Sequence, residues 1–208
     1  MAEFVIHNDF FKHNPLKKIS AAAISDFKLT TQYADELQAE IEQIVLKGDK
    51  TPERRSNYED DKNTIAAMDS GEAIVKFMRQ EHDGLTDSAL CKKALTLESE
   101  TVPLIMKRYM TSGQDRFIEL SFQILAQADI QYTEQLFADY KSIRNPYAQA
   151  VACLLFGERG MEDAPPLLME EYRRFQKDYP DEGFDQHPLL ALYILYGVTW
   201  SGIKRKPS

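Results

Sequence analysis

Apolar and aromatic positions recur along this chain at nearly constant intervals. Four aromatic residues each close the same pattern of two apolar residues, two less constrained residues and the aromatic, and they follow one another at intervals of 32, 31 and 32 residues. These aromatics are Phe77, Tyr109, Tyr140 and Tyr172. Because self-similarity at a fixed period is typical of repeat proteins, the pattern predicts one helical unit used four times.

A second apolar pattern alternates with the first one. Apolar pairs recur at intervals of 30, 30 and 40 residues, at Ala94-Leu95, Ile124-Leu125, Leu154-Leu155 and Ile194-Leu195. Strand signals are nearly absent after Leu29. The two alternating patterns therefore predict an all-α fold of about four antiparallel helix pairs.

Capping residues between the two patterns predict where the helices begin. We expect Asp69 and Glu72 to form a capping box, Thr86 to cap the second helix, and Thr133 to cap a short helix that ends near Ile143. Asn145 precedes Pro146, which is the arrangement of an N-cap followed by proline in the first helical position.

The same patterns divide the chain into four segments. Residues 1–28 show no sustained period and stay unassigned, whereas residues 29–68 predict a capping helix over Thr31–Lys47 followed by a polar loop at 49–63. The helical repeats are predicted over residues 69–200, and 201–208 is a short basic tail.

Three predicted helices contain a proline in their first turns. The segments are Val102-Pro103-Leu104-Ile105, Asn145-Pro146-Tyr147-Ala148 and Ala164-Pro165-Pro166-Leu167-Leu168. With helix pairs of about 31 residues, they make residues 69–200 resemble the HEAT and armadillo α-solenoid repeats. The resemblance implies stacked helix pairs, a concave surface lined by the second helices, and an N-terminal helical cap. The alternative is an irregular helical bundle with accidental periodicity.

Composition restricts the partner and the compartment. The formal net charge of −8 argues against a nucleic-acid backbone as the main partner; the expected partner is another protein, and the acidic surface leaves a basic one possible. Cys91 and Cys153 lie in apolar helical contexts and are expected to be buried free thiols. No basic leader with an apolar stretch is present, and no run approaches the ~18 apolar residues of a membrane span, so we expect a cytoplasmic protein.

No set of residues in the sequence predicts catalysis, a metal or a cofactor. The run Glu81-His82-Asp83 holds three potential ligands, but adjacent side chains do not converge on one ion, and a solvated helix end is the favoured interpretation. The nine glycines are scattered, and no phosphate-binding loop is present.

One polar strip is a candidate binding surface. It combines Arg116, Glu119 and Gln123, which share one face of a predicted second helix, with Tyr147 and Gln149, which begin the next second helix. The strip lies where the resemblance places a concave groove. The alternative interpretation is an ordinary solvated helix face.

These observations favour a non-enzymatic protein-binding, scaffold or regulatory module, for example a stoichiometric inhibitor or an immunity-type partner. The alternative is an enzyme on the same fold, since some HEAT-like proteins are DNA glycosylases and others are bilin lyases. A third possibility is a structural subunit with an exposed apolar patch.

Overall fold

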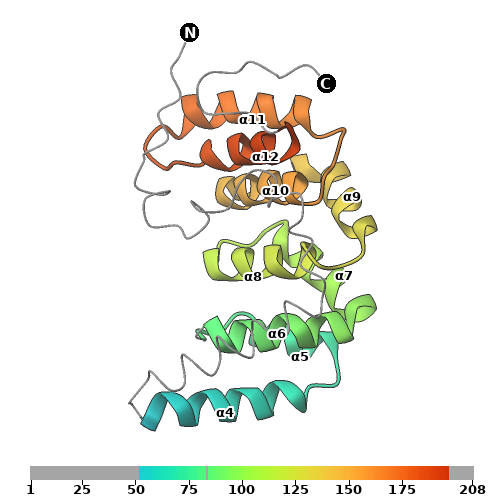
Figure 1. Ribbon diagram of the computed structural model, residues 1–208, viewed down its shortest axis with the longest axis vertical. Helices are drawn as coiled ribbons and strands as arrows, with labels where there is room; N and C mark the ends of the chain where they lie inside the picture. The colour runs from blue at the N-terminus through green and yellow to red at the C-terminus, as the bar shows by residue number, and fades with distance from the viewer. Residues whose placement is uncertain (1–51, 83, 197–208) are drawn as a thin grey trace. The chain divides into compact units, whose positions relative to one another are not determined.

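The computed structural model describes residues 52–82 and 84–196, and over these residues the protein is entirely helical, without strands (Figure 1). Residues 1–28, the predicted capping helix Thr31–Lys47, the end of the predicted repeat region at 197–200 and the basic tail at 201–208 lie outside the described residues. The elements are α4 (Pro52–Ala66), α5 (Gly71–Phe77), α6 (Gly84–Thr96), α7 (Glu98–Tyr109), α8 (Asp115–Leu125), α9 (Ile130–Ala138), the 3₁₀ turn η2 (Tyr140–Ser142), α10 (Pro146–Glu158), α11 (Pro165–Asp178) and α12 (Gln186–Tyr196).

The prediction of a polar loop at 49–63 is wrong, because α4 occupies most of that segment. Pro52 is the first residue of the helix, where its missing N–H is not needed. Tyr58 and Ile65 lie two turns apart and are both buried, at 3% exposed. A stripe of two residues is enough to attach a helix whose other positions are polar, so composition alone did not identify it.

The predicted helix starts are correct at some positions and wrong at others. Asn145 is the N-cap of α10, and its side chain accepts a hydrogen bond from the Tyr147 backbone N–H at 2.9 Å. By contrast, Ser70, not Asp69, caps α5, and α6 begins two residues before Thr86. Asp129, not Thr133, caps α9, because its side chain accepts from the backbone N–H of residue 131.

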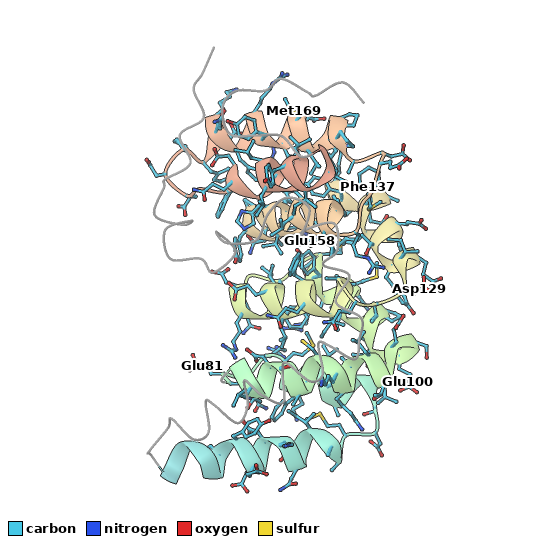
Figure 2. All side chains as sticks on the ribbon, in the orientation of Figure 1. Glu81, Glu100, Asp129, Phe137, Glu158 and Met169 are labelled. Carbon is cyan, nitrogen blue, oxygen red and sulfur yellow. The ribbon has the colours of Figure 1, made fainter. Side chains whose placement is uncertain are left out.

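Helices of the same order in successive pairs pack against one another. In the first-helix row α5 contacts α7, and α7 contacts α9; in the second-helix row α6 contacts α8, α8 contacts α10, and α10 contacts α12. The second-helix row is visible in Figure 1 as a succession of ribbons from α6 to α12. Side chains from neighbouring helices fill the space between them (Figure 2).

The four repeat aromatics all belong to the buried interior, with exposed fractions of 9% or less. The Tyr109 hydroxyl donates to the Ala148 carbonyl at 2.7 Å and so ties the end of α7 to α10. The Tyr140 hydroxyl lies 3.4 Å from Cys153 Sγ, also on α10. Both of these tyrosines therefore fill the core and place a polar tip on α10, Tyr109 from the preceding pair and Tyr140 from the same pair.

Both cysteines are free and buried, which confirms the sequence prediction. Burial raises the pKa of the Cys91 thiol to about 12, with the nearby Asp87 carboxylate adding to the effect. Burial likewise raises the pKa of Cys153 to about 12. Both side chains are therefore held as neutral thiols at neutral pH and act as small apolar residues.

Candidate functional site

The structure places the five residues of the predicted polar strip on two adjacent second helices. Arg116, Glu119 and Gln123 lie on α8, and Tyr147 and Gln149 lie at the start of α10. Glu119 and Gln123 are exposed, and the other three are half-buried. The strip residues therefore lie on neighbouring helices, and each side chain forms a hydrogen bond within the fold.

Two of these side chains bond from α8 to the preceding second helix. Arg116 forms an ion pair with Asp87 of α6, with 2.6 Å between the guanidinium Nη2 and the carboxylate Oδ2, and it also donates to the His82 carbonyl. One helix turn farther along α6, Cys91 Sγ donates to Gln123 Oε1 at 3.6 Å. Arg116 and Gln123 thus link α8 to α6.

Of the other three, Glu119 and Tyr147 bond to each other along the second-helix row, and Gln149 bonds outside that row. The Tyr147 hydroxyl donates to Glu119 Oε1 at 2.8 Å and joins α10 to α8. Burial and the Glu119 carboxylate raise the pKa of Tyr147, so the hydroxyl stays a donor. Gln149 Oε1 accepts from Arg174 Nη2 of α11 at 2.6 Å, and Gln149 Nε2 donates to the Ile143 carbonyl at 2.8 Å.

We call these contacts the polar ladder; its members are the pairs Asp87–Arg116, Cys91–Gln123, Glu119–Tyr147 and Gln149–Arg174. The paired residues are 29, 32, 28 and 25 positions apart in the sequence. These separations are close to one repeat, so the ladder joins successive helix pairs. Its side chains already have partners within the fold, which favours a structural role for the strip.

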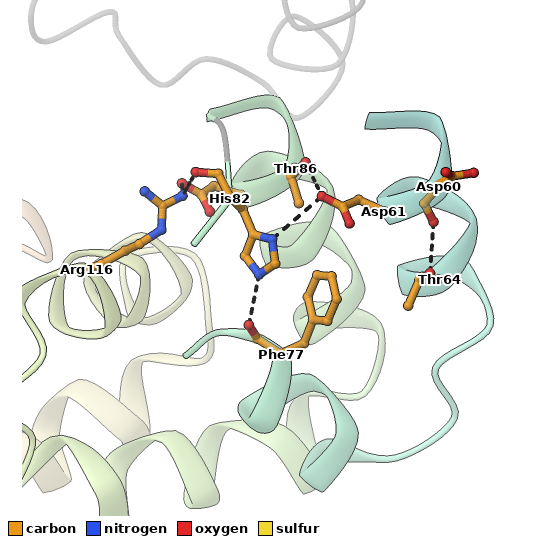
Figure 3. Close-up of polar contacts among 8 residues, drawn as sticks. Asp60, Asp61, Thr64, Phe77, His82, Thr86 and Arg116 are labelled. Carbon is orange, nitrogen blue, oxygen red and sulfur yellow. Dashed lines mark hydrogen bonds and ion pairs between the residues drawn. The ribbon is translucent and has the colours of Figure 1, made fainter. Parts of the chain in front are cut away.

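A second group of polar contacts surrounds His82 at the end of the first pair (Figure 3). The ring stacks on Phe77 with centroids 4.2 Å apart, and Nε2 lies 2.9 Å from the Phe77 carbonyl, to which it must donate. Nδ1 faces Asp61 of α4 at 3.6 Å, and Asp61 also accepts from Thr86 at 3.3 Å. His82 therefore joins α4 to α5, and Asp61 extends the link to α6 through Thr86.

A third group lies between α10 and α11. Glu171 is 5% exposed and forms an ion pair with Arg174 on the same helix. Burial, together with Cys153 and Glu171, raises the pKa of the Tyr140 hydroxyl well above its ordinary value. Tyr140, Cys153 and Glu171 are buried, and Arg174 is half-buried beside them. The Arg174 guanidinium thus supplies the positive charge that compensates the buried Glu171 carboxylate.

An open groove of about 410 Å³ lies between the neighbouring first helices α5 and α7. We call it the basic groove. Its charged side chains are Lys76 and Arg79 from α5 and the turn after it, Lys107 and Arg108 from α7, and a single carboxylate, Glu72. The half-buried Val75 and Leu104 supply apolar surface, and Thr111 supplies a hydroxyl.

The cations of the basic groove are accessible and are not neutralised by neighbours. Lys76, Arg79 and Lys107 are exposed, and none of the four forms an ion pair with another residue in the described part of the chain. Arg108 is half-buried, with its guanidinium 5.8 Å from the centre of the Phe117 ring. Lys76, Lys107 and Arg108 lie in the last turn of their helices, where the helix dipole favours positive charge. The groove therefore carries a local positive charge on a chain of net charge −8.

The sequence interpretation missed this groove, although the repeat contains a signal for it. Lys76 and Arg108 occupy the position directly before the repeat aromatic, in the first and second repeats. Aligning the four repeats on their aromatics places these two cations at equivalent positions of adjacent helices, which is where a shared patch would form.

Within residues 52–82 and 84–196, no group of three or more His, Cys, Asp and Glu side chains is placed to hold a metal ion. In the same residues, no helix has the length and apolar character needed to cross a membrane. Comparison with protein-family models, with curated proteins and with solved structures finds no match to this chain.

Proposed function

We propose that the helix pairs form a short α-solenoid of the HEAT-like kind, and that the protein is a non-enzymatic binding module that holds another protein on the solenoid surface. A single helix pair does not cover its own apolar face, so stacking pairs creates one continuous core and long surfaces along each row of helices. Such a surface suits the capture of a partner in a fixed ratio.

Two features support the solenoid part of this proposal. Helices of the same order contact one another from pair to pair, from α6 to α12 in the second-helix row and from α5 to α9 in the first-helix row. In addition, hydrogen bonds outside the polar ladder join groups about one repeat apart. Asn145 donates to the Ser112 carbonyl 33 residues earlier, and Arg159 donates to the Ala126 carbonyl, also 33 residues earlier. Hydrogen bonds that recur between successive units are what an array of stacked units requires.

The basic groove is the observation that carries the binding part. Along the second-helix row the predicted strip residues bond to one another or to adjacent helices, so each of these side chains already has a partner within the fold. Along the first-helix row, in contrast, several cations face an open groove and form no ion pair within the described residues. Charged side chains without an ion-pair partner, next to apolar surface, are a feature of recognition sites rather than of contacts that hold helix pairs together.

The proposal is tested by recovering the protein with its partner. The tagged protein is captured from native cell extract and passed through size-exclusion chromatography with light scattering, beside a capture with the tag alone. We expect a discrete complex of fixed composition that the tag alone does not retain. Recovery of only the protein itself, from several extracts and at low ionic strength, would contradict the proposed function.

A further inference from the structure

The charges beside the repeat aromatics change sign along the chain. In the first two repeats the two positions before the aromatic carry only positive charges, and in the last two they carry only negative ones. The charged residues at these positions are Lys76, Lys107 and Arg108, followed by Asp139, Glu170 and Glu171. Among these positions, positive charge therefore occurs only at α5 and α7, where the basic groove lies.

We propose that the basic groove is the docking site for an acidic segment of a partner protein, a peptide stretch whose glutamate or aspartate side chains alternate with aliphatic ones. This inference rests on the proposed function and names the chemistry of the partner. Carboxylates bind Lys76 and Arg79 on one side of the groove and Lys107 on the other.

The apolar part of the groove selects a peptide over a bare anion. Val75 and Leu104 are half-buried and line the groove together with the cations, so an aliphatic side chain of the ligand gains contact there. The Thr111 hydroxyl donates to the Arg108 carbonyl at 3.5 Å, and its oxygen remains an acceptor for a backbone N–H of the ligand.

Charge complementarity also favours a short acidic segment over an extended polyanion. The groove sets four cations against the single carboxylate of Glu72, which matches a ligand with a few negative charges. The chain as a whole carries −8, so a long nucleic acid that extends beyond the groove would meet repulsion.

The test uses peptide probes and two matched variants of the full chain. The groove variant reverses three exposed cations of the basic groove: Lys76→Glu, Arg79→Glu and Lys107→Glu. The control variant makes the same change in net charge at three exposed cations outside the groove: Lys141→Glu, Arg173→Glu and Lys177→Glu. Equal thermal melting of the two variants checks that both fold. Arg108 is left unchanged because it packs on Phe117.

The probe is a short fluorescein-labelled peptide of Glu-Glu-Leu triplets, and its binding is followed by fluorescence anisotropy at low ionic strength. We expect saturable binding to the wild type, binding at least about tenfold weaker to the groove variant, and a change within about threefold for the control variant. A Gln-Gln-Leu peptide should not bind. A Glu-Glu-Ser peptide should bind about threefold more weakly than the leucine peptide, because it lacks the aliphatic contact.

Several results would overturn the proposal. They are the absence of saturable binding at protein concentrations up to about 1 mM, equal weakening in both variants, or displacement of the probe by inorganic phosphate at matched ionic strength. Tighter groove-dependent binding of a single-stranded RNA would assign the groove to nucleic acid instead. Concentration-dependent dimers that the groove variant abolishes would assign it to a second copy of this chain.

Failure of this inference is distinguishable from failure of the proposed function. If a native complex forms but the groove variant retains it as well as the control variant does, the partner docks elsewhere and only the assignment of the groove is wrong. If no native complex forms with any extract, the binding function itself is wrong, whatever the peptides do.

Discussion

The substitution Gly157→Ala tests the packing of the second-helix row. Gly157 lies near the end of α10, and a Cβ added there would lie 2.5 Å from Ala191 Cα, 2.7 Å from Ala191 Cβ and 2.9 Å from the Ala191 carbonyl oxygen of α12. Two of these three atoms belong to the backbone, so α12 would have to move. The absence of a side chain at Gly157 is what permits this close approach.

Two opposing effects determine the size of the change. Alanine in place of glycine inside a helix stabilises it by about 1 kcal/mol. Overpacking a closed interior costs typically 1–3 kcal/mol, and the upper end applies when the obstructing atoms are backbone. We therefore expect Gly157→Ala to lower the free energy of unfolding by about 1–2 kcal/mol, which corresponds to a fall in Tm of about 2–8 °C for a chain of this size.

The assay is urea unfolding followed by far-UV circular dichroism. The matched control is Gly113→Ala, because a Cβ at Gly113 meets no atom within 4 Å. We expect no loss of stability in the control. The double variant Gly157→Ala with Ala191→Gly removes only the Cβ contact and should recover part of the loss. If Gly157→Ala alone raised the stability by about the helix-propensity gain, α10 and α12 would not approach as described, and the reasoning would be refuted.

Three further outcomes are expected. Tyr109→Phe removes the buried hydrogen bond to the Ala148 carbonyl, so urea unfolding should show a loss of about 1–2 kcal/mol. Burial lowers the pKa of His187 below 6.5, so as pH falls through 6.5 the unfolded chain takes up a proton before the folded protein does. Wild-type stability should therefore fall between pH 7.5 and 5.5 by up to about 1.4 kcal/mol more than that of His187→Gln, and equal losses would contradict this assignment. Because the pKa of both thiols is raised to about 12, Cys91 and Cys153 should react with a thiol reagent at pH 8 only after unfolding in urea; rapid reaction of the native protein would contradict their burial.

The all-helical fold could be predicted because its signals are local. The repeat aromatics and the cap at Asn145 depend on neighbouring residues alone, and the structure places them as the spacing indicates. Helix α4 was missed for the opposite reason. Its attachment depends on Tyr58 and Ile65 meeting residues of later elements, and a two-residue stripe is too weak a periodic signal.

The candidate site was harder to predict than the fold. Periodicity placed Arg116 and Glu119 on one helix face, but it did not reveal that each would bond to a neighbouring helix, since those partners lie about 30 residues away. The basic groove was missed because its cations are far apart in the sequence. Lys76 and Arg108 look like ordinary last-turn cations until the repeats are aligned and α5 is placed beside α7.

Hydrogen–deuterium exchange on the purified native complex tests the central claim most directly, because it shows which helix row the partner covers. Exchange of the free protein is compared with that of the complex, peptide by peptide. We expect slower exchange in the complex over residues 71–79 and 104–111, which hold the basic groove, with little change over α8 and α10. Protection confined to the polar ladder on the second-helix row, with none at the groove, would contradict the account.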